Sequence, residues 1–367
     1  MNNNLKLFSP FQLGLLSLSH RIVMAPLTRL RSGQPGDIPT DLMVKYYGQR
    51  VSEGGLIISE ATSITRKNRG YLGAPGIYSD DQIIGWKKVT DAIHAKGGRI
   101  FLQLWHVGRV SHVDLNDGAI PIGPSVITSE AVAFTANGWV PVSPNRALKL
   151  EEIPGVVEEF RKAAERALAA GFDGVELHAA NGYLLDQFLQ DGTNKRADAY
   201  GGSIPNRARL LIEIAKAIAS VWGSDRVGVR LSPSSKFHNM SDSNPDALFS
   251  HVAEELSKVG LSYLHIVEPR INGSELIQEG LQPVAAGLLR KHFKGSIIAA
   301  GGFEPNSAEA IIESGDADLV AFGRHFISNP DLPKRIKNHF PLSPYDRNSF
   351  YGGDHRGYTD YPAYDKQ

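Results

Sequence analysis

The sequence predicts an α/β protein built as a (β/α)8 TIM barrel. Eight short runs rich in Val, Ile, Leu and Ala are spread along the 367-residue chain. Most are continuously apolar rather than alternating, which is typical of strands buried on both faces of a parallel sheet. Segments of helical character separate them. Alternating strands and helices with crossovers of this length indicate a parallel sheet, and eight repeats is the number that closes a barrel.

The predicted strands lie at 21–26, 55–60, 99–105, 173–178, 226–232, 261–268, 295–302 and 317–323. The predicted helices lie at 79–98, 150–171, 204–223, 244–260 and 304–315. The first begins with Ser and Asp capping residues and ends on glycines, and the second carries acids early and bases late. A doubly wound open sheet is the alternative architecture. It is weakened because no G-x-G-x-x-G motif follows a strand.

Two stretches depart from the strand–helix repeat. Residues 107–150, after the third strand, are rich in Gly, Pro, Ser and Asn and lack helical periodicity. We interpret them as an inserted cap over the barrel mouth. The aromatic, glycine-rich tail 349–364 is expected to fold back as an ordered lid, covering about 341–364. With no linker that would split the chain, we expect one domain over 1–367.

Composition excludes several classes of function. Lys plus Arg and Asp plus Glu both number 39, and this balance argues against a nucleic-acid binder. The absence of cysteine excludes disulfides, thiolate zinc sites, iron–sulfur clusters and catalytic thiols. The histidines 94, 106 and 112 have spacings that fit no common zinc motif, so no metal site is predicted. No signal peptide and no apolar stretch of 18 residues is found, so we expect a cytoplasmic protein that does not bind membranes.

In a barrel, the loops that follow the strands gather at one mouth and build the active site. The loops after strands seven and eight carry Gly301-Gly302 and Gly323-Arg324. Such loops often hold a phosphate with backbone N–H groups, and an Arg suits bidentate phosphate contact. Tight turns without a ligand are the structural alternative.

Arg230 and Gln103 are polar residues inside apolar strands. A buried ion pair and a satisfied core amide are the structural alternatives for them. Taken together with the phosphate loops, they favour a flat heteroaromatic phosphate as the ligand.

Several blocks in order carry a family resemblance: LFSPFQLGLLSLSHRIVMAPLTRLRS, GLIISEAT, QLWHVGR, ELHAANGYLLDQFLQDGTNKRADAYGGSIPNRARL, AFGRHFISNPDLP and FYGGDHRGYTDYP. On these blocks, which cover nearly the whole chain, it resembles the flavin-dependent ene-reductases of the Old Yellow Enzyme family. The run VGLSYLHIVEPR is similar to that of the oxophytodienoate reductase and bacterial N-ethylmaleimide reductase branches.

The resemblance implies FMN, bound non-covalently at the barrel mouth. Ala25, Pro26 and Thr28 are implied to contact the isoalloxazine, Ala61 its face and Gln103 its pyrimidine edge. Arg230 is implied to lie beside N1 and O2, where it would stabilise the anionic reduced ring. The phosphate is implied to lie on Gly301, Gly302, Gly323 and Arg324, with Tyr351 of the tail packed near the ring.

The resemblance also implies the reaction. NAD(P)H reduces FMN in a ping-pong cycle, and flavin N5 then passes hydride to the β-carbon of an α,β-unsaturated carbonyl or nitro compound. His178 and Asn181 are implied to donate to the substrate oxygen, and Tyr183 to protonate the α-carbon. Tyr71 and Trp105 are implied to line the substrate pocket. We expect small-molecule activated alkenes as substrates and a monomer or a weak homodimer.

On the pattern alone, His178, Asn181 and Tyr183 are also compatible with a core histidine, a capping Asn and a packed phenol. A flavin-free barrel lyase or isomerase that uses His178 and Tyr183 as acid and base is the alternative enzyme, and a binding module without turnover is the other alternative. Arg207 and Asp198 are interpreted as members of structural ion pairs.

Overall fold

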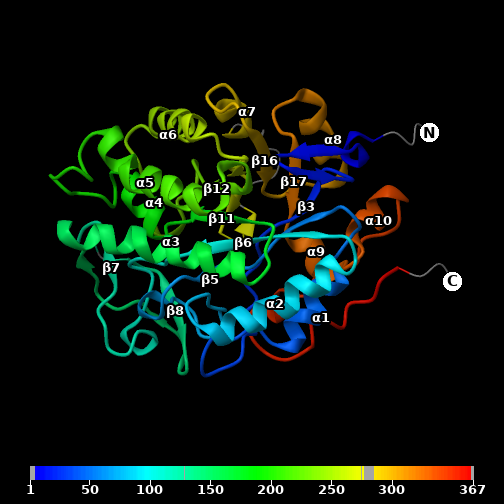
Figure 1. Cartoon of the computed structure of the whole chain (residues 1–367), viewed down its shortest axis with the longest axis horizontal. Coiled ribbons are helices and arrows are strands. Elements are labelled where there is room, and N and C mark those ends of the chain that lie inside the picture. The colour runs from blue at the N-terminus through cyan, green and yellow to red at the C-terminus, as the bar shows by residue number, and fades with distance from the viewer. Residues whose placement is uncertain (1–4, 128, 274, 277–284, 365–367) are drawn as a thin grey trace.

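Eight parallel strands close into a barrel in the computed structural model, which describes residues 5–127, 129–273, 275–276 and 285–364. Each strand pairs with the next, and β11 with β6 and β17 with β3 complete the ring (Figure 1). The barrel strands are β3 (Ile22–Met24), β4 (Leu56–Ile58), β6 (Arg99–Trp105), β11 (Gly174–Ala179), β12 (Val227–Leu231), β13 (Tyr263–Val267), β16 (Ser296–Ala300) and β17 (Leu319–Phe322). Seven of them lie inside the predicted runs and β11 extends one residue beyond its run, so the predicted TIM barrel is confirmed.

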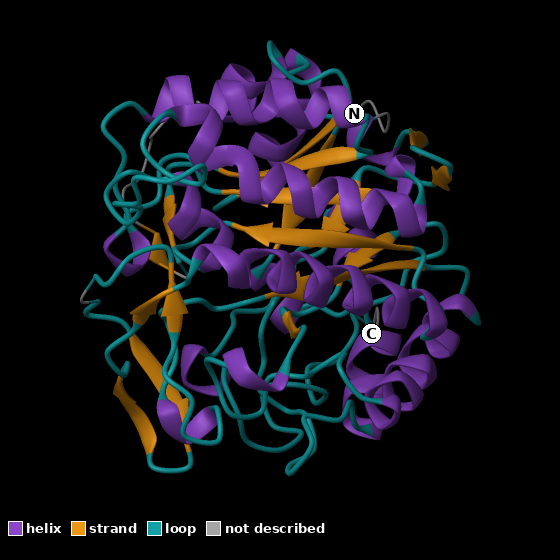
Figure 2. Ribbon diagram, turned by 60° about the vertical axis from the view of Figure 1, so that its left-hand side comes forward, coloured by secondary structure: helices purple, strands orange, loops and turns teal. Residues whose placement is uncertain are grey.

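Both faces of these strands are buried, which is the physical reason for their continuous apolar sequence. On β11, the outward side chains of Val175 and Leu177 join the large cluster between the barrel and its helices. A separate inner cluster includes Phe101, Tyr263 and Leu319. Figure 2 shows the helices surrounding the strands. None of the helices in the described ranges is long and apolar enough to cross a membrane.

An N-terminal hairpin closes the end of the barrel opposite the mouth. It is formed by β1 (Phe11–Leu13) and β2 (Leu16–Leu18), and Leu13 and Leu18 join the inner cluster. Its turn residue Gly14 has φ +55°, and a Cβ there would lie 2.0 Å from the backbone oxygen of Asp225, just before β12. Only glycine fits this close approach.

The five predicted helices are confirmed, and further helices lie between them. The described helices are α1 (Asp41–Gln49), α2 (Asp80–His94), α3 (Ile153–Ala169), α4 (Leu184–Leu189), α5 (Ile204–Trp222), α6 (Pro245–Val259), α7 (Ala285–Arg290), α8 (Pro305–Ser314), α9 (Arg324–Ser328) and α10 (Leu332–Lys337). Ser79 and Gln82 form a capping box at the start of α2, as its sequence predicts. Helix α1 was not predicted, although Thr40 caps it, and neither were the short helices α4, α7, α9 and α10.

Short strands supplement the barrel, several of them in the insertion after β6. They are β5 (Thr62–Ser63), β7 (Ile122–Gly123), β8 (Val132–Thr135), β9 (Gly138–Pro141), β10 (Arg146–Ala147), β14 (Ile271–Asn272) and β15 (Glu275–Leu276). Strands β8 and β9 form an antiparallel hairpin. Val132 and Trp139 from this hairpin line the cavity described below, which places the insertion beside the mouth.

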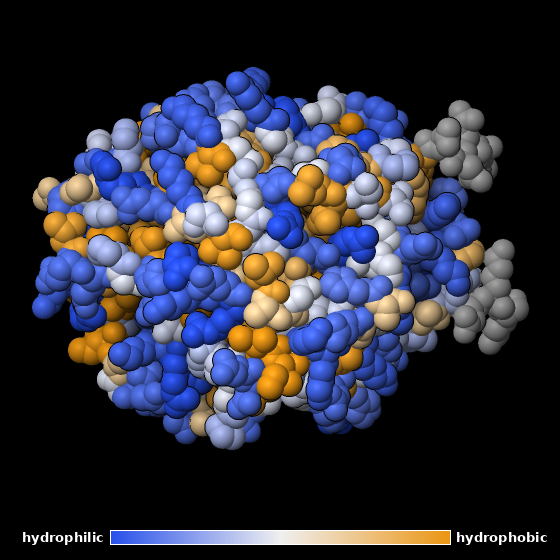
Figure 3. Space-filling view, in the orientation of Figure 1, coloured by the Kyte–Doolittle hydropathy of each residue, from blue (hydrophilic) through white to orange (hydrophobic). Residues whose placement is uncertain are grey.

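The C-terminal tail folds back onto the barrel. The ring of Tyr358 stacks on Tyr46 of α1, with centroids 4.0 Å apart. Arg29 donates to the carbonyl oxygens of Phe350 and Gly357, at 2.8 and 2.7 Å, so buried guanidinium groups hold the tail. The surface in Figure 3 is mainly hydrophilic, with hydrophobic residues in small groups. The single-domain division of 1–367 stays a prediction, and its extreme ends lie outside the described residues.

Candidate active site

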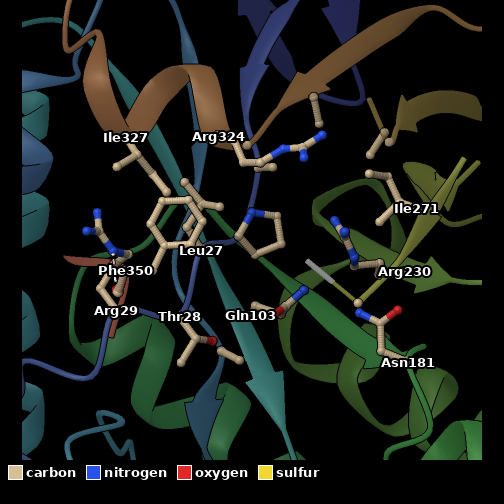
Figure 4. A pocket seen from close by; sticks show the side chains of 18 of the residues that line it. Leu27, Thr28, Arg29, Gln103, Asn181, Arg230, Ile271, Arg324, Ile327 and Phe350 are labelled. Carbon is tan, nitrogen blue, oxygen red and sulfur yellow. Dashed lines mark hydrogen bonds between the residues drawn. The ribbon is translucent and has the colours of Figure 1, made fainter. Parts of the chain in front are cut away.

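One cavity of about 520 Å³ lies at the C-terminal ends of the barrel strands. Figure 4 shows part of its lining, with side chains from several strands and loops around a common opening. All the residues that the sequence analysis assigned to a site line it: Ala25, Pro26, Thr28, Ala61, Tyr71, Gln103, Trp105, His178, Asn181, Tyr183, Arg230, Gly301, Gly302, Gly323, Arg324 and Tyr351. The structure therefore brings together residues that are more than 300 positions apart in the chain.

A tight turn after β11 aims three polar side chains into this cavity. Asn181 has φ +57° and Gly182 has φ +75°, so the chain reverses through two left-handed residues. The backbone N–H of Asn181 donates to Ser232 Oγ on the neighbouring strand end at 2.8 Å, which fixes the turn. His178 ends the inward-facing side of β11, and Tyr183 immediately precedes α4. Asn at a left-handed position is common, so the turn and the site use the same residue.

Aromatic rings form one wall of the cavity. Trp105 stacks between two of them, with centroids 5.6 Å from Tyr71 and 6.3 Å from His178. Tyr183 meets His178 edge to face at 5.0 Å. The phenol oxygens of Tyr183 and Tyr71 are 3.4 Å apart. Packing of this kind holds the Tyr183 ring in one orientation beside His178.

Two polar atoms of this turn are buried without a partner. His178 Nδ1 and Asn181 Oδ1 form no hydrogen bond with the described residues. Buried polar atoms are nearly always bonded in native proteins, so unpaired ones that line a cavity indicate a missing ligand. Rotation of the Asn181 amide presents its NH2 group at the same place.

Burial sets the protonation states of the two ring residues. It lowers the pKa of His178 well below 6.5, and the positive charge of Arg230 lowers that pKa further. The imidazole is therefore neutral near pH 7. Burial also raises the pKa of Tyr183 well above 10, and the neighbouring Tyr71 adds to this. The Tyr183 phenol consequently keeps its proton near pH 7.

Polar groups line the base of the cavity. Gln103 is 1% exposed, and its Nε2 donates to Glu176 Oε1 at 2.7 Å. Arg230 Nη1 contacts His265 Nε2 at 2.8 Å. Glu176 and His265 were not predicted as site residues. The available signal was the one used for Gln103 and Arg230, a polar residue inside an apolar strand.

The glycine-marked loops after β16 and β17 lie side by side. Gly301 and Gly302 have φ +117° and +65°, conformations that strongly favour glycine. The loops are joined by His325 Nε2 and Glu304 Oε1, 2.9 Å apart. Arg324 lines the cavity from the second loop. Glycines let backbone N–H groups approach the cavity closely. Together with the neighbouring guanidinium, such groups suit an anionic ligand.

Loop residues outside the predicted set also line the cavity. Leu27, Arg29, Phe237, His238 and Phe350 are among them. Phe237 and His238 belong to the loop between β12 and α6. His238 Nδ1 donates to the carbonyl oxygen of Asn181 at 2.9 Å and so supports the turn.

The two charged residues interpreted as structural belong to ion pairs. Arg207 pairs with Asp242, and both side chains are nearly inaccessible. Asp198 pairs with Arg196 at 2.6 Å. Neither residue lines the cavity.

Comparison with known proteins identifies the family. The profile of the NADH:flavin oxidoreductase / NADH oxidase family matches residues 6–343. The chain belongs to the Old Yellow Enzyme family. This membership makes it an FMN-dependent NAD(P)H oxidoreductase of the ene-reductase type. A flavin-free lyase or isomerase is therefore set aside.

Named relatives of this Old Yellow Enzyme chain match nearly its whole length. It is 46% identical to a flavin oxidoreductase of Emericella nidulans, over 97% of each protein. It is 47% identical to 12-oxophytodienoate reductase 1 of Oryza sativa, over 97% of this chain and 92% of the relative. Morphinone reductase in complex with tetrahydroNAD superposes with a TM-score of 0.91 at 49% identity, covering 99% of this chain and 98% of the other. An Old Yellow Enzyme homologue from Zymomonas mobilis gives 0.93 at 41% identity, covering 98% and 99%.

Proposed function

We propose that this protein reduces the C=C bond of small activated alkenes, using the turn of His178, Asn181 and Tyr183 as its catalytic group. The observation that carries the proposal is the pair of buried, unpartnered polar atoms on His178 and Asn181, beside a protonated phenol. An α,β-unsaturated carbonyl or nitro compound has an oxygen for the pair and a carbon that needs the proton.

The chain's own residues fit FMN. Thr28, Gln103 and Arg230 supply a hydroxyl, an amide and a positive charge around one opening (Figure 4), which suits the polar edge of a flat ring system. The two glycine loops and Arg324 suit the phosphate. Tyr351 and Phe350 of the tail border the same space. Non-covalent binding is expected, because the chain has no cysteine for a thioether link and the fit relies on polar contacts.

When bound, FMN would supply the hydride chemistry that links NAD(P)H to the β-carbon of the substrate. His178 and Asn181 hold the substrate oxygen, and their polar hydrogens stabilise the negative charge that develops there. Donors fixed by the protein are worth most for such charge, since they need no reorganisation. The packing of His178 against Trp105 and the hydrogen bond from Asn181 to Ser232 provide this fixation.

Tyr183 delivers the proton to the α-carbon. Its phenol is protonated and held edge-on to His178, 5.0 Å between centroids. An acid placed beside the oxygen site lies within reach of the carbon next to the activating group. Tyr71 and Trp105 enclose the substrate.

Two further expectations stay predictions: a cytoplasmic location, and a monomer or weak homodimer.

A flavin titration with a substrate panel tests this function. The purified protein should be yellow and release FMN on denaturation. After anaerobic reduction by NADH or NADPH, the bound flavin should be reoxidised by an enone, a maleimide and a nitroalkene, with recovery of the saturated product. Colourless protein unable to take up FMN would contradict the cofactor sites. Flavin that is reduced but never reoxidised by any activated alkene would contradict the substrate class.

A further inference from the structure

A buried carboxylate lies behind the polar groups at the base of the cavity. Glu176 is fully buried and stands two residues before His178 on β11. Its Oε1 accepts a hydrogen bond from Gln103 Nε2 at 2.7 Å. Its Oε2 accepts from Tyr263 at 3.1 Å and from His265 Nδ1 at 2.9 Å. One carboxylate thus holds side chains from β6 and β13.

His265 carries this connection on to Arg230. Arg230 Nη1 lies 2.8 Å from Nε2 and 3.2 Å from Nδ1 of His265. Nδ1 donates to the carboxylate, so Nε2 is the ring nitrogen that keeps a lone pair facing the guanidinium. The imidazole is neutral: burial, and then the charge of Arg230, lower the pKa of His265 to about 4. The chain of contacts is guanidinium, neutral imidazole, carboxylate.

This arrangement leaves the charge of Arg230 available to the cavity. Among the described residues, no carboxylate lies within ion-pair distance of Arg230, while His265 and Glu176 are in contact. Glu176 balances the buried charge from one imidazole away, and Coulomb attraction weakens with distance. In Figure 4, Arg230 and Gln103 reach the same opening from different strands.

We propose that Glu176 and His265 are positioning residues that aim Gln103 and Arg230 at the ring of the bound cofactor and keep the positive charge of Arg230 directed at it. This inference rests on the proposed FMN site. Its consequence is thermodynamic. The reduced ring is anionic and the oxidised ring is neutral, so a charge aimed at the ring favours reduced FMN and raises its midpoint potential.

The test measures the midpoint potential of the bound flavin in His265→Phe. This change keeps a ring in the barrel core but removes the contacts of the imidazole with Glu176 and Arg230. Reduced FMN should bind about tenfold more weakly relative to oxidised FMN, which is a fall of about 30 mV for a two-electron couple. FMN should still be retained through its phosphate.

Two matched variants distinguish the loss of the positioning of Arg230 from a general loosening of the core. His265→Gln keeps an acceptor for Arg230 and a donor for Glu176, and it should restore most of the potential. Tyr263→Phe removes another donor to the same carboxylate but breaks no contact with Arg230 or Gln103. It should leave the potential unchanged even where the melting temperature falls.

In Glu176→Gln the midpoint potential of the bound flavin should shift in the opposite direction. This variant also provides the test if His265→Phe does not fold. Removing the negative charge leaves Arg230 uncompensated, so the potential should rise. A wild-type potential in His265→Phe and Glu176→Gln overturns the inference, and so does an equal fall in Tyr263→Phe. Wild-type protein that binds no FMN overturns the proposed function and this inference together, whereas bound FMN with an unmoved potential overturns only the inference.

Discussion

The phenol oxygens of Tyr71 and Tyr183 lie 3.4 Å apart in the wall of the cavity. Both rings pack on Trp105, one stacked and one edge-on. Burial raises the pKa of Tyr71 to about 12 and that of Tyr183 well above 10. The pair is therefore fully protonated near neutral pH. Only Tyr183 is also in contact with His178, so we assign the proton transfer to Tyr183.

Tyr183→Phe should slow enone reduction while leaving the earlier steps intact. A positioned general acid contributes about 10²–10⁴-fold in rate. Flavin reduction by NAD(P)H should persist, and so should hydride acceptance by nitroalkenes, which stabilise the carbanion as a nitronate. Stopped-flow measurement of the two half-reactions checks this. Tyr71→Phe is the matched control and should cost much less, because it keeps the acid. Equal losses in both variants would contradict the assignment.

Asn181→Ala should impair the oxygen site itself. Loss of one donor to a developing oxyanion costs about 10²–10³ in rate, or about 2.7–4 kcal/mol. Phenols should also bind more weakly, because the same donors hold a phenolate, and their charge-transfer band should fade. Since the backbone of Asn181 is in the left-handed region, which glycine adopts readily, Asn181→Gly is the better matched variant: it keeps the turn and removes the side-chain amide. Full enone turnover in the Gly variant would exclude Asn181 as a donor.

Arg324→Ala should weaken cofactor retention. A hydrogen bond to a charged group is worth about 1.5–3 kcal/mol, so the FMN dissociation constant should rise about 10- to 100-fold. The rate at which NAD(P)H reduces flavin that remains bound should hardly change. Arg324→Lys keeps the charge but not the planar fork, and it should give an intermediate constant. Fluorescence titration of the apoprotein with FMN measures the dissociation constant of the wild type and of both variants. An unchanged constant in the Ala variant would remove Arg324 from the phosphate site.

Stability should fall in acid because of buried neutral histidines such as His106. Burial lowers the pKa of His106 to about 3. Between about pH 6.5 and 3 the unfolded chain binds a proton here that the folded protein does not, so the free energy of unfolding falls as pH falls, by about 1.4 kcal/mol per pH unit for one such group. His106→Asn keeps an acceptor for the Gly108 N–H and should remove this contribution in urea unfolding at pH 5 to 7.

Glu60 provides the control of opposite sign. Burial raises the pKa of its carboxyl to about 7, so here the folded protein holds the proton that the unfolded chain releases. Its contribution to stability falls as pH rises from about 4.5 to 7. Glu60→Gln should therefore steepen the rise of stability with pH, whereas His106→Asn should flatten it. The same slope in both variants would contradict these protonation states.

Continuous apolar runs such as 319–322 predicted the barrel correctly, because a strand buried on both faces needs that composition whatever surrounds it. Helix ends were predictable for the same local reason: Ser79 caps α2 through its own neighbours. Gln103 and Arg230 could be recognised as polar residues where the strand pattern wants apolar ones. The apolar strands, the helix caps and the polar residues inside strands each depend on a few adjacent residues, so they can be recognised from the sequence alone.

The partners of these groups depend on the closed barrel. Glu176 and His265 meet only because β11, β12 and β13 pair in one register. This register aligns Glu176 with Gly228 and Gly228 with Tyr263, and His265 follows two residues later on the same face of β13. The tail comes beside the cavity because Arg29 holds the carbonyl oxygens of residues more than 300 positions away. Hydrogen bonds and charges act over a few ångströms in space, and no local pattern records which distant residues will lie within that distance.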